Sequence, residues 1–171
     1  MERTRTSSRT SAHDVAAAVI FDSGPIDALK LQKLVFLAAG EYLALTGKPM
    51  FGEDFEAWDY GPVVHAVYVT YKGSEGTGPI TAAKKGDPTK LNDVARGCVE
   101  SVVQRFGHAT GAELIRFTHE MDPWANSYRP GQYRTLIDNQ AIYDYFAQSP
   151  TTEQAAEAVS AWNSAVLSGR P

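Results

Sequence analysis

The sequence has little of three features that narrow function quickly: cysteine, long apolar runs and excess positive charge. One of its 171 residues is a cysteine, Cys98, so no internal disulfide can form, which fits a reducing compartment. No apolar run approaches the roughly 20 residues needed to span a bilayer. The opening stretch, MERTRTSSRTSAHD, lacks the apolar core of a secretory signal. We therefore expect a cytoplasmic protein without a membrane partner.

The balance of charge disfavours nucleic acid as a partner. The formal net charge is −4, whereas nucleic-acid-binding proteins are usually basic. Arg3, Arg5 and Arg9 could contact a polyanion, but a solvated tail is the simpler interpretation because disorder concentrates at chain ends.

No familiar catalytic or metal-binding pattern is present. The four histidines, His13, His65, His108 and His119, do not pair at a metal-ligand spacing, and Cys98 has no second cysteine beside it. Cys98 falls on an apolar helical stripe, which predicts a small buried hydrophobe rather than a nucleophile. We expect no metal and no cofactor.

The composition is that of one globular domain, with 43% apolar and 21% charged residues. The pattern predicts a mainly α fold, a single compact domain of about six to eight helices with a minor extended or β element near residues 51–58. It divides the chain into a flexible tail at 1–11, a helical domain at 12–148 and a C-terminal helix at 149–171 packed on that domain.

Capping residues, Gly and Pro mark the expected helices. Asp27 is a predicted N-cap for the second helix, Thr110 and Glu113 form a predicted capping box, and Pro62 suits the first position of a third helix. The expected helices begin near residues 12, 28, 62, 88, 111, 122, 139 and 151.

The second helix, residues 28–46, is the most apolar of these. Its apolar residues widen one helical face so far that we expect burial on more than one side; they are Leu29, Leu31, Leu34, Val35, Phe36, Leu37, Ala38, Tyr42 and Leu45. Lys30 and Lys33 interrupt this face. They either extend their ammonium groups to solvent or frame a binding groove.

The segment FEAWDYGPVVHAVY, residues 55–68, places large aromatic side chains beside a Gly-Pro pair. Trp58 and Tyr60 are residue types found both as interface anchors and in cores, and composition alone favours the core. The residues alone therefore leave both roles open.

Four segments in order resemble a known family: KLQKLVFLA, a Gly-Lys-Pro-x-Phe link, FEAWDYGPVVHAVY and LIRFTHEMDPW. Together they resemble the Panacea domain of SocA-like antitoxins, a group that includes phage-associated GepA-type proteins. The resemblance spans about residues 13–146, while the preceding tail and the helix after Pro150 fall outside it.

The resemblance implies a non-enzymatic antitoxin of a prophage-associated toxin–antitoxin system. Such a domain neutralises a cognate protein toxin, encoded by the adjacent gene, through direct binding, and one relative instead acts as an adaptor that hands its toxin to a protease. The residues that we assign to partner binding are Lys30, Lys33, Trp58, Asp59, Tyr60, Gly61, Pro62, His119 and Trp124.

Two other functions stay open. An enzyme could use Trp58, Asp59, Tyr60, His119 and Asp122, provided that one pocket joins these side chains. A DNA-binding autoregulator could use the arginines of the tail.

For stability, the apolar stripes predict that aspartate at Leu34 or at Val94 unfolds the domain, because each change would bury an unpaired charge.

Overall fold

The computed structural model describes residues 9–73, 78–132 and 134–148. The predicted C-terminal helix at 149–171 lies outside the described residues, as do Arg3 and Arg5.

The described chain is mainly helical, as predicted, with seven α-helices and a small antiparallel sheet of three strands. Within this part of the chain, no helix is both long and apolar enough to cross a membrane. The elements in chain order are α1 (Ala12–Ser23), α2 (Ala28–Thr46), β1 (Phe55–Trp58), β2 (Gly61–Val63), α3 (His65–Tyr71), the short 3-10 helix η2 (Pro88–Lys90), α4 (Asp93–Phe106), α5 (Gly111–His119), α6 (Asp122–Ala125), β3 (Leu136–Ile137) and α7 (Asn139–Gln148).

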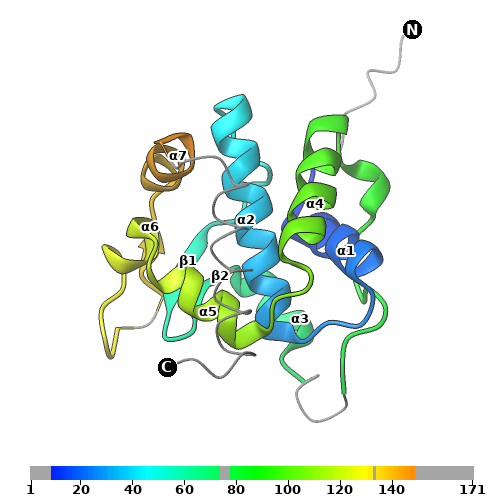
Figure 1. The fold of residues 1–171 in the computed structure, drawn as a ribbon, viewed down its shortest axis with the longest axis horizontal. Helices are drawn as coiled ribbons and strands as arrows, with labels where there is room; N and C mark the ends of the chain where they lie inside the picture. Colours follow the sequence, from blue (N-terminus) through cyan, green and yellow to red (C-terminus); the bar gives the residue numbers. More distant parts are fainter. Residues whose placement is uncertain (1–8, 74–77, 133, 149–171) are drawn as a thin grey trace, which may run out of the picture.

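Helix α2 runs through the middle of the molecule, with α1 and α4 on one side and α7 on the other (Figure 1). Every residue from 31 to 40 is buried, which confirms burial on more than one side. Asp27 accepts a hydrogen bond from the backbone N–H of Lys30 at 2.8 Å, and Gly47 ends the helix with φ +69°. Two predicted members of the apolar face are exposed instead, Leu29 by 37% and Leu45 by 72%.

The start of helix α1 is closed by side-chain hydrogen bonds. Ser11 is its N-cap, and the Ser11 side chain and Asp14 form a capping box. Asp14 is nearly buried and also accepts a hydrogen bond from the backbone N–H of Asp87 at 2.8 Å. One carboxylate therefore closes the helix start and holds a distant loop.

Helix α4 corrects two predictions. The Asp87–Pro88 start produces only the short helix η2, and α4 begins after Asn92, whose side chain accepts from the N–H of Ala95. Val94 then lies in the first turn, where it is 47% exposed, so it does not belong to the buried stripe. Cys98 is buried on that stripe as predicted.

The third helix is present, but its predicted start at Pro62 is wrong. Gly61–Val63 forms strand β2, which pairs with β1 in a hairpin, and α3 begins at His65. Proline favours a helix start, but it is also tolerated in strands where its missing N–H is not needed by a neighbouring strand. The order of strands is β2-β1-β3, so β1 is central.

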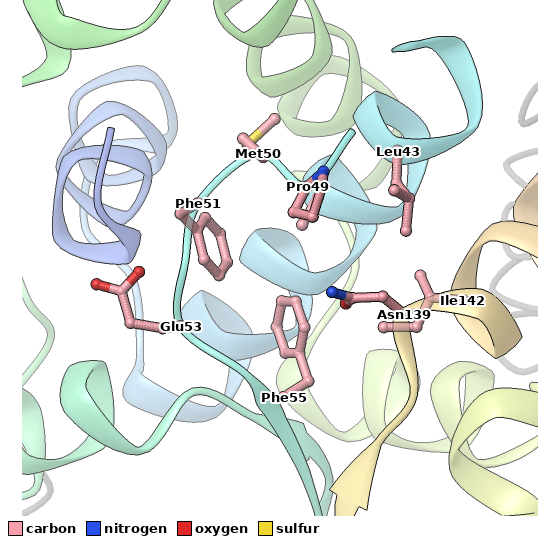
Figure 2. A pocket seen from close by; sticks show the side chains of 9 residues that line it. Leu43, Pro49, Met50, Phe51, Glu53, Phe55, Asn139 and Ile142 are labelled. Atoms are coloured by element: carbon pink, nitrogen blue, oxygen red, sulfur yellow. The ribbon is translucent and has the colours of Figure 1, made fainter. Parts of the chain in front are cut away.

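The link between α2 and β1 packs against the start of α7. Figure 2 shows Phe51 of this link and Phe55 of β1 turned toward the interior, with Ile142 of α7 nearby. Glu53 turns the other way and accepts a hydrogen bond from the backbone N–H of Ala12 at 3.1 Å. The link thereby ties the start of α1 to the sheet.

Candidate partner-binding site

The β1–β2 hairpin ends in a tip formed by Trp58, Asp59, Tyr60 and Gly61, hereafter the hairpin tip. Trp58 pairs with Gly61 across the strands, which leaves Asp59 and Tyr60 as a two-residue turn. Both turn residues are exposed, Tyr60 by 62%. Gly61 has φ +103°, a backbone conformation that L side chains rarely adopt.

Helix α2 supports the hairpin from within through two buried polar side chains. Lys33 is 0% exposed and donates from its Nζ to the carbonyl oxygen of Pro62 at 3.0 Å. Gln32 donates to the carbonyl of Val64 at 3.2 Å and accepts from the N–H of Val64 at 2.9 Å. These bonds explain two polar residues on an otherwise apolar helix, because buried polar groups need partners.

Lys33 lies close enough to Gly61 that the glycine is required. A Cβ at position 61 would lie 2.7 Å from Cε of Lys33 and 2.9 Å from the hydroxyl oxygen of Thr118. The side chain of Lys33 therefore passes directly beneath the hairpin tip.

Burial lowers the pKa values of two side chains near the hairpin tip, Lys33 and His119. Burial lowers the pKa of Lys33 from 10.5 to about 7, partly offset by the charge of Asp27. The pKa of His119 is also lowered, chiefly by burial and further by the positive charge of Lys33, while the backbone of Asp59 raises it in part. The Nε2 atom of His119 is buried and has no hydrogen-bond partner among the described residues.

An aromatic stack, His119, Trp124 and Tyr128, supports the other side of the hairpin tip. The ring of His119 lies 3.9 Å from that of Trp124, and Tyr128 stacks on Trp124 at 4.6 Å. Trp124 donates its indole N–H to the carbonyl of Trp58 at 2.8 Å, and the hydroxyl of Tyr128 donates to Asp59. The predicted aromatic residues of α5 and α6 thus meet the predicted hairpin residues.

Glu56 is a structural residue of this region that the sequence did not single out. Its side chain is nearly buried and accepts from the indole N–H of Trp58 at 2.7 Å and from Nε of Arg134 at 3.0 Å. In the sequence, Glu56 is one of four acidic residues close together, with Glu53, Asp54 and Asp59. Such a cluster is more typical of a solvated surface.

Lys30 lies apart from the hairpin tip. Its Nζ donates to the carbonyl of Gly107, the residue that caps α4. A cation at the carboxyl end of a helix interacts favourably with the helix dipole. The first lysine of the KLQKL segment therefore stabilises the junction of α2 and α4, while Gln32 and Lys33 serve the hairpin.

A pocket opens beside the hairpin tip between the start of α2, the hairpin, α3 and the residues Gly131, Gln132 and Arg134, hereafter the hairpin pocket. Its volume is about 520 Å3. The residues that line it include Leu29, Trp58, Tyr60, Val63, Val67 and Tyr68.

The structure brings most of the predicted binding residues together but exposes few of them. Asp59 and Tyr60 are exposed, whereas Lys33, Gly61 and Pro62 are buried. The remaining members, Lys30, Trp58, His119 and Trp124, are half-buried.

The pocket does not join the five residues of the enzyme alternative. Trp58, Asp59 and Tyr60 line it, but His119 and Asp122 do not. His119 packs instead in the aromatic stack. In the described part of the chain, no group of three or more His, Cys, Asp or Glu residues could hold a metal ion.

The fold and this site define a small helical domain in which helix α2 and an aromatic stack support a β-hairpin. Residues 31–125 match the family described as Antitoxin SocA-like, Panacea domain, and the chain belongs to that family. This interval contains Lys33, the hairpin tip, His119 and Trp124, whereas Tyr128 of the aromatic stack lies outside it.

A more specific similarity links the chain to the protein named Antitoxin SocA from Caulobacter vibrioides (strain NA1000 / CB15N). The two are 32% identical over 111 residues, which is 58% of this chain and 58% of that protein. The chain therefore matches somewhat more than half the length of its curated relative. No solved structure matches this chain.

Proposed function

We propose that this protein is an antitoxin that neutralises a cognate protein toxin by direct binding, with the hairpin tip as part of the contact surface. Membership of the SocA-like family supports the general role. The similarity to the protein named Antitoxin SocA supports the same role at the level of one relative.

The observation that carries the proposal is the combination of exposure and bracing at the hairpin tip. Tyr60 is 62% exposed, yet the backbone on either side of it is hydrogen-bonded to Lys33 and to Trp124. A contact surface that is ordered before binding loses less conformational entropy when the partner arrives. Tyrosine at such a position is a frequent energetic anchor of protein interfaces.

The protein acts by binding rather than by catalysis in this proposal. Three hydrogen bonds around the hairpin tip hold the fold: Lys33 bonds to Pro62, Trp124 to Trp58, and Tyr128 to Asp59. The function requires a toxin partner, no cofactor and no nucleic acid, and it operates in the cytoplasm.

Co-expression with the product of the adjacent gene tests the proposal. We expect that product to be toxic alone and harmless when this protein is present. An adjacent product that is harmless alone, or that stays toxic in the presence of this protein, overturns the proposal. A falling level of the toxin during co-expression indicates delivery to a protease, and a constant level indicates neutralisation by binding alone.

Tyr60→Ala tests the contact surface. We expect the substitution to weaken toxin binding by about tenfold or more, as for an interface anchor, with unchanged circular dichroism. The matched control is Tyr143→Ala, because Tyr143 is a partly exposed tyrosine on α7. Equal toxin binding by both variants and the wild type would remove Tyr60 from the contact surface.

A further inference from the structure

The hairpin pocket has a carbon-rich interior because its inner polar groups are already engaged. The indole N–H of Trp58 donates to Glu56 at 2.7 Å, and both side-chain ends of Gln32 bond to Val64. The hydroxyl of Tyr71 accepts from the N–H of Lys84 at 3.0 Å. An occupant of the interior therefore meets aliphatic and aromatic surface and needs no polar group of its own.

The rim of the hairpin pocket offers one exposed cation, Lys72, for which the described residues provide no ion-pair partner. Arg134 also lines the rim, but it pairs with the carboxylate of Glu56 at 3.0 Å, and Asp59 accepts the hydroxyl of Tyr128. A carboxylate on a partner would be favoured at this rim.

The pocket is continuous with the proposed contact surface. Asp59 and Tyr60 belong to the hairpin tip and also line the pocket. Its volume of about 520 Å3 falls in the range of sites that enclose drug-sized ligands. A space of this size can also receive more than one large apolar side chain.

We propose that the hairpin pocket receives an apolar anchor of the toxin, a segment with large aliphatic or aromatic side chains next to an acidic residue. This inference rests on the proposed antitoxin function and adds the chemistry of the partner segment. The apolar side chains enter the interior beside Leu29, Val67 and Tyr68, and the acidic residue lies against Lys72.

Leu29→Trp tests the interior. Leu29 is 37% exposed at the pocket, so a larger side chain can fill the pocket without overpacking the core. Leu45→Trp is the matched control, since Leu45 is 72% exposed at the other end of the same helix. With the purified product of the adjacent gene as the probe, we expect at least tenfold weaker binding by Leu29→Trp and wild-type affinity for Leu45→Trp.

Lys72→Glu tests the rim. We expect about three- to tenfold weaker binding, mainly through slower association, together with a smaller dependence on salt. Lys85→Glu makes the same charge change at an exposed position in the loop before η2 and should bind as the wild type does. Short overlapping peptides of the toxin complete the test: those that compete for the pocket should combine large apolar residues with Asp or Glu.

The outcomes separate the two proposals. If the wild type fails to bind or neutralise the toxin, the antitoxin proposal fails. If the wild type binds but Leu29→Trp binds equally well, the toxin anchor does not use this pocket and the further inference alone is wrong. Self-association of the wild type that Leu29→Trp abolishes would assign the pocket to a second copy of this chain and would also overturn the inference. Competing peptides that are all basic would contradict the charge assignment.

Discussion

At the scale of single residues, Lys33 is the side chain whose environment has the clearest consequence. It is fully buried beneath the hairpin tip, and its pKa falls from 10.5 to about 7 because burial disfavours the charged form. The unfolded chain holds this proton at higher pH than the folded chain does. The unfolded state therefore binds more protons between about pH 7 and pH 10.5, so this group makes the free energy of unfolding rise with pH in that window.

Lys33→Met should remove this dependence. A single group of this kind contributes a slope of up to about 1.4 kcal/mol per pH unit. Methionine keeps the unbranched side chain without the charge, so we expect a flatter profile between pH 7 and pH 10 in denaturant unfolding. Lys48→Met, at an exposed position, is the control. An unchanged slope in Lys33→Met would show that Lys33 does not titrate differently in the folded state.

Gly61→Ala should strain the hairpin tip in two ways. The residue has φ +103°, and the new Cβ would lie 2.7 Å from Cε of Lys33. We expect a loss of roughly 2–3 kcal/mol in the free energy of unfolding, since strained backbone conformations cost about 1–3 kcal/mol and the contact adds to this.

Gly47→Ala separates the backbone effect from the steric effect. Gly47 also has a positive φ, +69°, but a Cβ added at this position would meet nothing within 4 Å. Gly47→Ala should lower the free energy of unfolding by about 1 kcal/mol. Equal losses at both positions would mean that the contact with Lys33 relaxes without cost.

At the scale of elements, Leu34 on α2 and Val94 on α4 differ in how far they are exposed. An aspartate is therefore expected to have a different effect at each position, although the sequence alone predicted unfolding for both. Leu34→Asp places a charge at a 0% exposed position of the central helix. We expect a loss on the order of 4 kcal/mol or more, enough to unfold a marginally stable domain. Loss of helical circular dichroism at room temperature is the measurement.

Val94→Asp should leave the domain folded, contrary to what the apolar helical pattern of the sequence predicts. Val94 is 47% exposed in the first turn of α4. A carboxylate near the start of a helix is favourable, so the change in stability should stay within about 0.5 kcal/mol. A melting temperature close to that of the wild type would confirm this, and unfolding would restore Val94 to the core.

The elements that the sequence identified correctly are those with strong local signals. Caps at Asp27 and Thr110, together with the continuous apolar pattern of α2, place those helices correctly. The hairpin was missed because β2 has only three residues and contains Pro62, which carries a stronger local signal for a helix start. Exposure of Val94 depends on where Asn92 begins the helix, and a helical stripe alone does not fix that position.

The sequence motifs selected residues that lie close together in the fold, but not the structural role that each of them has there. From the order of the sequence motifs we selected Lys33, the hairpin tip, His119 and Trp124. The fold brings these residues together. The burial of Lys33 and Pro62 could not be predicted from the spacing of the motifs. The two residues are 29 positions apart in the sequence, and only the fold brings them within hydrogen-bond distance. Glu56 was missed for a similar reason: its partner Arg134 lies 78 residues away.

At the scale of the whole molecule, the interval that defines the family is smaller than the packed unit. The family match covers residues 31–125, whereas α1 and α7 both pack on α2 outside that interval. The ring of Phe146 on α7 lies so close to Gly40 that a Cβ there would approach it within 2.3 Å. We propose that the folding unit spans at least Ser11 to Gln148, since it includes α7 and the N-cap of α1.

Two fragments test this proposal. A fragment of residues 9–148 should unfold cooperatively. A fragment of residues 31–125 should lack cooperative unfolding, because the faces of α2 that contact α1 and α7 would be exposed to water. Thermal unfolding followed by circular dichroism measures both. Cooperative unfolding of the shorter fragment would show that α1 and α7 are dispensable.

The bonds from α2 to the hairpin also close the outer edge of the sheet at β2. An edge strand with unpaired backbone groups invites another chain to add a strand. Here Pro62 has no N–H to offer, its carbonyl is taken by Lys33, and Gln32 occupies both backbone groups of Val64 as a neighbouring strand would. Strand addition at β2 is therefore closed both to the toxin and to other copies of this chain, so recognition at the hairpin has to proceed through side chains.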